Sequence, residues 1–319
     1  FKKKIQSSPL PDVIVASYPT IDLCFESVKF GMTNNVPVIV DVRDLWPDIF
    51  VEAFPKVLQI FAKLLLDFLY KRKVKTIFSK ASSIIGVSKK YLSFGLSKAK
   101  KTLSSNDRVF ELGYLPNRNL PKDGIEASFF KKLGVDPSRP IILFAGTFGK
   151  TYDLEAPIKT ALDLNKNPED STLFIFCGSG ENEKKWKNMS RGANNIIFTG
   201  WLDESKLQYV LSISDVGLAA YVKNAPQGLP NKIIEYMAFG LPILSSLRGE
   251  AESLLIKNNL GFTYDPENVK SFKENLNKIL EPEIKIKISK NCNEKFESDY
   301  SSTQIYEEFE KHLLKINEK

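Results

Sequence analysis

Short, uniformly apolar segments alternate with stretches of helical periodicity in the second half of this 319-residue chain. A strand that is apolar on both sides must be covered on both faces, and strands that alternate with helices form parallel sheets. Several of these segments end at a glycine, which lets a ligand approach the backbone at the carboxyl end of a strand. The pattern predicts an α/β fold with parallel sheets. The predicted strands are residues 141–145, 172–177, 195–199, 216–220 and 242–245, and the predicted helices are residues 154–164, 181–189, 204–211 and 231–239.

The first half repeats this alternation less completely. It has about half the strands of a complete Rossmann unit, so we expect either that further residues precede this chain in a longer protein or that the first domain is small. The predicted strands are residues 13–17, 36–42 and 83–87, and the predicted helices are residues 22–31 and 56–75.

A turn-rich segment, residues 115–121, begins the connection between the halves. We therefore predict a first domain at 1–122 and a second at 123–302. Residues 297–316 have the pattern of one long amphipathic helix, and we expect its end, at 303–319, to complete the first domain.

Histidine is the scarcest catalytic residue type, since His312 is the only one. We therefore expect neither a Ser-His-Asp triad nor a zinc site with histidine ligands. The three cysteines (Cys24, Cys177 and Cys292) are widely spaced, which favours neither a disulfide framework nor a metal knuckle and fits a reducing cytoplasm.

Positive charge is concentrated in the first half. Residues 1–122 carry 20 Lys and Arg against 10 Asp and Glu, whereas the remainder carries 25 against 28. Within the first half, residues 56–80 combine seven basic residues and one acid with a wide apolar face. Such a helix can lie on the anionic inner face of the cell membrane. The alternative is a core helix with a solvated stripe. No recognition motif for nucleic acid accompanies the charge.

The segment 227–243 is the most informative part of the chain. A turn at 228–230 leads into a helix that begins at Asn231. The first turn of a helix presents unpaired N–H groups and a partial positive charge, which suit a diphosphate. Lys232 adds a full charge there, and Glu235 lies one turn further on the same face, where it can accept hydrogen bonds from ribose. A capped helix with a Lys–Glu pair at the surface is the alternative.

This segment resembles the donor-site signature of the retaining glycosyltransferases of family 4, which has two glutamates separated by seven residues. Glu235 corresponds to the second glutamate, which holds the donor ribose in that family, and Gln227 occupies the position of the first. An amide hydrogen-bonds to sugar hydroxyls but carries no charge to stabilise an oxocarbenium-like transition state. The resemblance implies a donor site at Asn231, Lys232 and Glu235, with same-face attack assisted by the leaving diphosphate.

The loops that follow two predicted strands fall in the order of that family. Residues 144–150 resemble the first loop of the donor domain, where Gly146 and Gly149 approach the diphosphate and Lys150 is the candidate clamp. Gly178 belongs to a second such loop, although its Gly-Ser-Gly pattern alone is a weak signal. Trp201 and Leu202 resemble the residues beside the nucleotide base; packing in the core is the alternative for Trp201.

A charged turn follows a buried strand of the first half at residues 41–48. It is similar to the Arg-Asp-x-Trp-Pro element of family 4 enzymes of the lipopolysaccharide and capsule type. That resemblance makes Arg43 and Asp44 candidate groups on the side of the sugar and acceptor, and a structural Arg43–Asp44 pair is the alternative.

These resemblances together imply a GT-B fold, with two Rossmann-like domains whose sheets face a cleft, the first domain being incomplete. They imply transfer of a hexosyl or N-acetylhexosaminyl unit from a nucleotide sugar to a saccharide or polyprenyl-diphosphate-linked acceptor, with retention, in cell-surface polysaccharide synthesis. No cofactor and no obligatory metal are expected, because lysines and a helix dipole would neutralise the diphosphate. An inactive nucleotide-sugar binder and a GT-B-type epimerase remain alternatives.

Overall fold

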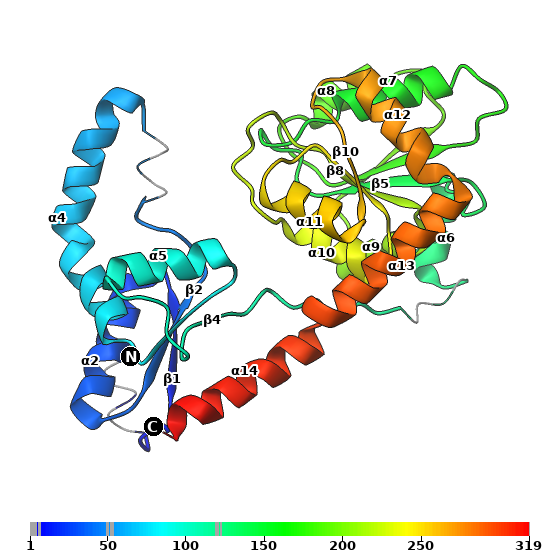
Figure 1. The fold of residues 1–319 in the computed structure, drawn as a ribbon. Helices are drawn as coiled ribbons and strands as arrows, with labels where there is room; N and C mark the ends of the chain where they lie inside the picture. Colours follow the sequence, from blue (N-terminus) through cyan, green and yellow to red (C-terminus); the bar gives the residue numbers. More distant parts are fainter. Residues whose placement is uncertain are drawn as a thin grey trace. The chain divides into compact units, whose positions relative to one another are not determined.

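A computed structural model describes residues 5, 8–48, 51, 54–118, 121 and 123–318 (Figure 1). Its internal contacts divide the chain into two compact units. Unit 1 comprises Phe1–Gly113 with Ser302–Lys319, and unit 2 comprises Tyr114–Ser301. Each unit is α/β and its sheet is parallel, which confirms the predicted fold class. The division falls at Gly113, ahead of the predicted connection, of which residues 119 and 120 lie outside the described part.

The described residues of unit 1 form a four-stranded parallel sheet in the order β1-β2-β3-β4. Successive side chains of a strand point to opposite faces, and β2 is buried at all of its positions because helices cover both faces. Val40 faces the core shared with α2, α4 and α5, whereas Ile39 faces α14. The strands are β1 (Ile14–Tyr18), β2 (Val38–Val42), β3 (Ser83–Gly86) and β4 (Arg108–Val109), and the helices are α2 (Ile21–Asn34), α4 (Lys56–Lys80), α5 (Lys89–Ala99) and α14 (Ser302–Asn317).

The tail is two helices, so the predicted single helix over 297–316 is wrong. Tyr300 ends α13, its carbonyl oxygen accepts the N–H of Tyr114 at 3.1 Å, and Ser301 forms a parallel bridge with Tyr114. A carbonyl used in this way is not available to the next helical turn, and α14 starts afresh at Ser302. The amphipathic pattern did not reveal the break because the competing hydrogen bond comes from a residue far away in the sequence.

The described residues of unit 2 form a six-stranded parallel sheet in the order β10-β9-β8-β5-β6-β7. The strands are β5 (Ile141–Ala145), β6 (Leu173–Cys177), β7 (Ile196–Gly200), β8 (Val216–Ala219), β9 (Ile243–Ser245) and β10 (Gly261–Thr263). The helices are α6 (Ile125–Lys132), α7 (Glu155–Leu164), α8 (Glu183–Met189), α9 (Glu204–Ile213), α10 (Asn231–Ala238), α11 (Glu250–Asn258), α12 (Val269–Leu280) and α13 (Pro282–Asp299). All of the predicted strands and helices of this half are confirmed to within two residues at each end.

The strand order reverses next to β5. The chain runs from β5 outward through β6 to β7 and then returns to place β8 on the other side of β5. Connections on opposite sides of β5 leave a crevice at the carboxyl ends of β5 and β8, which is where open α/β sheets bind ligands. The fold therefore marks one edge of unit 2 as the place to look for a site.

No helix in the described part of the chain is long and apolar enough to cross a membrane.

Unit 1 depends on the packing of α14 against its sheet. Ile316, which is 2% exposed, packs against Ile39 and Ile85. We expect Ile316→Ala to destabilise unit 1 by about 2–4 kcal/mol, because it leaves a cavity beneath the sheet. Amide hydrogen exchange of β2 and β3 measures the loss, and Leu314→Ala, on the same helix but 59% exposed, is the control. Equal exchange in both variants would contradict this assignment.

Candidate functional site

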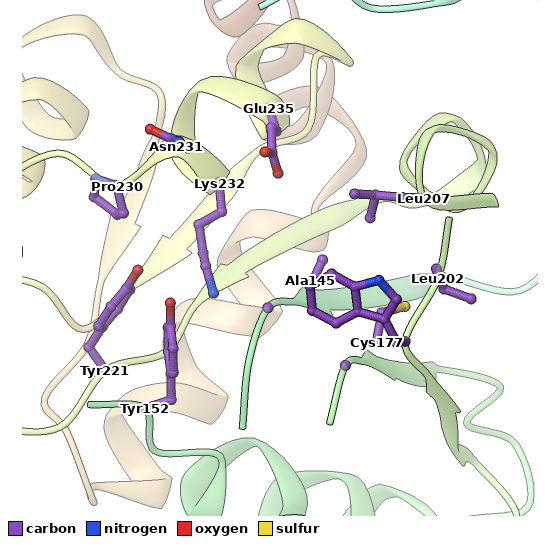
Figure 2. A pocket seen from close by; sticks show the side chains of 13 residues that line it. Ala145, Tyr152, Cys177, Leu202, Leu207, Tyr221, Pro230, Asn231, Lys232 and Glu235 are labelled. Carbon is purple, nitrogen blue, oxygen red and sulfur yellow. The ribbon is translucent and has the colours of Figure 1, made fainter. Parts of the chain in front are cut away.

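A cavity of about 360 Å³ lies at the carboxyl ends of β5, β6 and β8 in unit 2 (Figure 2). Its walls come from the loops after these strands, from the residues after β7 and from the first turns of α10. The lining residues are Ala145, Gly146, Tyr152, Cys177, Gly178, Trp201, Leu202, Leu207, Tyr221, Pro230, Asn231, Lys232 and Glu235. The cavity thus brings together seven of the predicted donor-site residues from four separate stretches of the chain.

Lys232 is the most unusual residue of this cavity. It is 6% exposed, and its Nζ has no hydrogen-bond partner among the described residues. Burial lowers the pKa of Lys232 from 10.5 to about 7, and Glu235 opposes that shift. The alternative of a surface Lys–Glu pair is therefore wrong, because the amine is buried and directed into the cavity (Figure 2).

Aromatic rings surround the amine of Lys232. Its Nζ lies 3.9 Å from the ring centroid of Phe144, 4.1 Å from that of Tyr152 and 5.4 Å from that of Tyr221. The face of an aromatic ring attracts a cation, by up to about 2 kcal/mol when water is excluded. The rings therefore offset part of the cost of burying the charge, while leaving its hydrogen-bonding capacity to a ligand.

Tyr152 and Tyr221 line the cavity although the sequence pattern does not mark them as site residues. They follow β5 and β8, and an isolated antiparallel bridge joins their backbones with the ring centroids 4.6 Å apart. A tyrosine soon after a buried strand was the available signal, but the sequence does not indicate that two such loops meet.

Glu235 is half-buried, and burial raises the pKa of its carboxyl group, an effect that Lys232 opposes. In Figure 2 both side chains extend from α10 into the cavity, Lys232 on the side of Tyr152 and Glu235 on the side of Leu207. The cavity therefore has a cationic end between aromatic rings and an acidic end beside Leu207 and Leu202.

Two glycines let the cavity extend to the backbone. A Cβ atom at Gly146 would lie 2.9 Å from the Lys232 Nζ, and one at Gly178 would lie 1.9 Å from the carbonyl oxygen of Gly146. Both have positive φ angles, 153° and 139°, which L side chains rarely adopt. Only glycine fits at either position, so a ligand there meets bare backbone.

Trp201 and Leu202 line the acidic end. The indole of Trp201 is 72% exposed, which excludes the alternative that it packs in the core. An exposed ring at the mouth of a cavity offers a flat apolar surface on which a planar group can stack. Leu207, from α9, adds an apolar contact that the sequence analysis did not identify.

Two predicted donor-site residues, Lys150 and Gly149, do not line the cavity, and neither does Gln227, which is predicted to lie on the side of the sugar and acceptor. Lys150 is 86% exposed, and its Nζ lies 3.9 Å from a carboxylate oxygen of Glu181. Gly149 shapes the loop, since its carbonyl oxygen accepts the Tyr152 N–H and the Asn182 side chain. Gln227 is half-buried before α10, and its Oε1 finds no hydrogen-bonding partner in the described part of the protein. Their roles toward a donor stay predictions.

Arg43 and Asp44 belong to unit 1 and are exposed directly after β2. Arg43 Nε donates to Asp41 Oδ2 at 2.6 Å, and Asp44 Oδ1 accepts the N–H of Leu45 at 2.6 Å. The predicted alternative of an Arg43–Asp44 pair is therefore wrong, because Arg43 turns back to the buried carboxylate of the strand.

Across the residues that the structure describes, no group of three or more His, Cys, Asp or Glu side chains is placed to hold a metal ion. The cysteines Cys24, Cys177 and Cys292 are buried free thiols. Burial raises the pKa of Cys177 to about 12, so its thiol is neutral near pH 7 although it lines the cavity.

Two α/β units with parallel sheets, the second with a cavity at the switch point of its sheet, are features of GT-B proteins. The profile of the family Glycosyl transferases group 1 matches residues 126–298, more than half of the chain. The chain therefore belongs to this family. An uncharacterized glycosyltransferase from Methanocaldococcus jannaschii is 25% identical over 238 residues, which are 72% of this chain but only 57% of that relative.

Solved structures show the same fold. HepE from Anabaena in complex with UDP aligns with a TM-score of 0.70 at 15% identity, covering 98% of this chain and 81% of that one. WaaG, a glycosyltransferase involved in lipopolysaccharide biosynthesis, aligns with a TM-score of 0.58 at 13% identity, covering 91% and 84%. At these identities the alignments establish the GT-B architecture.

Removing the buried amine should stabilise the protein. Lys232→Met keeps the aliphatic stem among the rings and deletes the charge, so we expect a gain of about 1–4 kcal/mol in the free energy of unfolding. The pKa of Lys232 is lower in the folded than in the unfolded protein, so the unfolded chain binds the extra proton between about pH 7 and 10.5. The cost of the charge is therefore complete below about pH 7 and shrinks as the pH rises.

Denaturant unfolding at about pH 6.5 and 9.5 measures this difference. Lys150→Met, at an 86% exposed side chain, is the control and should change the stability by less than about 0.5 kcal/mol. A loss of stability in Lys232→Met at the lower pH would contradict the assignment.

Proposed function

We propose that this protein transfers a sugar from a nucleoside diphosphate sugar to a saccharide or polyprenyl-diphosphate-linked acceptor, with retention of the anomeric configuration. The sugar is a hexosyl or N-acetylhexosaminyl unit. The single observation that carries the proposal is the buried amine of Lys232, which points into a cavity at the switch point of a parallel sheet without a protein acceptor among the described residues. An anion bound in the cavity would supply the hydrogen-bond acceptor that this amine lacks.

The two ends of the cavity fit the two ends of a nucleoside diphosphate. The Lys232 amine and the N-terminus of α10 suit the diphosphate, because the first N–H groups of a helix point outward with a partial positive charge and Pro230, which precedes the helix, has no side-chain group that can cap them. Gly146 leaves room for a phosphate oxygen beside the amine, and Gly178 lets its loop approach the backbone of Gly146. Glu235 accepts from ribose hydroxyls, and Trp201 with Leu202 contacts the base.

The chemistry follows from these assignments. When the glycosidic C–O bond breaks, negative charge develops on the leaving diphosphate, and Lys232 and the helix N-terminus stabilise it without an obligatory metal ion. The acceptor hydroxyl attacks the same face of the sugar and passes its proton to the leaving diphosphate oxygen. Gln227 takes no nucleophilic part and hydrogen-bonds to the sugar, and Arg43 and Asp44 act on the side of the sugar and acceptor.

The proposal includes a place in the cell. The lipopolysaccharide role of the similarly folded WaaG supports an enzyme of cell-surface polysaccharide synthesis, of the family 4 type. A lipid-linked acceptor places such an enzyme in the cytoplasm, peripherally on the inner face of the cell membrane.

Substitutions at the donor site test whether this protein binds a nucleotide there, beyond its similarity in fold to glycosyltransferases. UDP and UDP-glucose, the ligands of the HepE structures, are the first probes. We expect Glu235→Ala and Lys232→Ala to weaken UDP binding by about tenfold or more, because each removes a charged hydrogen bond worth about 1.5–3 kcal/mol. Isothermal titration calorimetry measures the affinity, and Glu294→Ala, at an exposed glutamate of α13, is the control.

Hydrolysis of the donor distinguishes a transferase from an inactive binder. Turnover of a nucleotide sugar by the unchanged protein, insensitive to EDTA and lost in both variants, is the expected result. Undiminished turnover in both variants would overturn the site, whereas UDP binding without any turnover would favour the inactive binder.

The amine of Lys232 should make nucleotide binding depend on pH. A diphosphate beside the amine raises its pKa above the value of about 7 that burial imposes. UDP binding at about pH 8 therefore takes up a proton, and the affinity falls as the pH rises, by up to about tenfold per pH unit. Calorimetry in buffers of different ionisation enthalpy measures the uptake. A pH-independent affinity between about pH 7.5 and 9.5 would contradict the role of the amine.

A further inference from the structure

The N-terminal half of α4 exposes an apolar surface that the donor site does not use. Eight large apolar side chains there are between 49% and 87% exposed, whereas monomeric proteins rarely expose contiguous apolar patches of this kind without an interaction to serve. The predicted alternative, a core helix with a solvated stripe, is therefore wrong for this half of α4. We call these residues the apolar face of α4: Val57, Leu58, Ile60, Phe61, Leu64, Leu65, Phe68 and Leu69.

The other half of the helix anchors the apolar face to the core of unit 1. Val74, Ile77 and Phe78 are buried in the core of unit 1, and Figure 1 shows the N-terminal half of α4 extending past the sheet of its unit. At 1.5 Å per residue, the stretch from Val57 to Leu69 is about 18 Å long. The side chains of Lys56 and Asp67 lie outside the described part of the structure.

Next to the apolar face lies a cavity of about 410 Å³ lined by lysines, which we call the lysine pocket. The acid that lines it, Asp48, is bonded through both carboxylate oxygens to Lys98 at 2.6 and 2.8 Å. Leu66 and Val74 form apolar wall between the lysines. The lysines are Lys63, Lys71 and Lys75 of α4, Lys98 of α5 and Lys100, which follows α5. Among the described residues that line this pocket, five lysines face one carboxylate, and this excess of positive charge suits an anion.

We propose that the apolar face and the lysine pocket form one docking surface for an anionic lipid bilayer. The apolar side chains enter the boundary between headgroups and acyl chains, and the lysine pocket holds the phosphate of a lipid headgroup beside it. Charge complementarity selects this occupant: a second copy of the chain would bring a like-charged lysine pocket to the same surface, whereas an anionic headgroup neutralises it.

This surface is independent of the donor cavity, since all of its residues lie in unit 1. Membrane binding can therefore be measured whether or not the protein transfers a sugar. A bilayer-bound protein meets its acceptor at the membrane if that acceptor is lipid-linked, so the inference adds to the proposed function without depending on it.

Vesicle sedimentation with the full chain tests the apolar face. We expect binding to vesicles of phosphatidylcholine with phosphatidylglycerol and much weaker binding to phosphatidylcholine alone. Phe61→Glu and Phe68→Glu, at side chains that are 70% and 87% exposed, should each lower the partition coefficient by about tenfold or more. Ile125→Glu, which changes an 82% exposed isoleucine of unit 2, is the matched control and should bind as the unchanged protein does.

A double variant tests the lysine pocket. Lys71→Gln with Lys75→Gln should lower binding to anionic vesicles by about tenfold or more, since each basic residue near an anionic surface contributes about fivefold. Lys270→Gln with Lys290→Gln, at lysines of unit 2 that are 86% and 74% exposed, is the matched control. All of the α4 variants should keep the circular dichroism spectrum of the unchanged protein and its UDP binding, which would show that they fold. Glu235→Ala should retain vesicle binding.

Each of the following outcomes would overturn the proposal. They are equal binding to the two kinds of vesicle, binding unchanged by Phe68→Glu, a concentration-dependent dimer that Phe68→Glu abolishes in the absence of vesicle binding, and capture of acidic polypeptides but not vesicles. Inorganic phosphate, used as a probe, distinguishes a free phosphate from the phosphate of a lipid headgroup. Stabilisation by phosphate that needs Lys71 and Lys75, without any vesicle binding, would assign the pocket to a free phosphate and reject the lipid.

Discussion

The donor cavity of unit 2 is organised around an amine that is buried between aromatic rings. The Lys232 amine sits where it does because the rest of α10 is locked to the sheet. Tyr236 donates a hydrogen bond to the carbonyl of Leu218 in β8 at 3.0 Å, and its ring covers Gly217 so closely that a Cβ there would lie 2.4 Å away. Ile233 and Met237 are fully buried on the same helix. The backbone of Lys232 is therefore fixed against the sheet, and its side chain is directed into the cavity.

The burial of this amine lowers the stability of the unliganded protein but favours the binding of a diphosphate. A buried ammonium without a hydrogen-bonding partner destabilises the free protein, and the rings of Phe144 and Tyr152 compensate only in part. The same lack of a partner prepares the site, because a diphosphate oxygen that enters meets a donor already stripped of water and fixed in place. Gly146 serves the same end, because a Cβ atom at this position would lie 2.9 Å from the amine.

The sequence predicted the elements of unit 2 well and the assembly of its site only in part. The strand at 141–145 was predicted to the residue because a proline and a glycine bound an uninterrupted apolar run. Lys232 and Glu235 were found because their spacing on one helix is local. Tyr152 and Tyr221 were not, since they meet only after β8 has crossed to the far side of β5. Lys150 shows the converse: a cation after a glycine loop fits the pattern, yet its side chain extends into solvent, where no local rule fixes its direction.

The return of α14 to unit 1 imposes an order on folding during synthesis. Unit 2 is one continuous stretch, so it can close its core as soon as Ser301 has left the ribosome. Unit 1 is synthesised earlier, but one face of its sheet remains uncovered until α14 has been made. Ile39 and Ile85 pack against Ile316 of that helix, and Ser83 forms a hydrogen bond with His312 at 3.0 Å. The unit synthesised first is thus completed last, and one face of its sheet stays uncovered for the time needed to make unit 2.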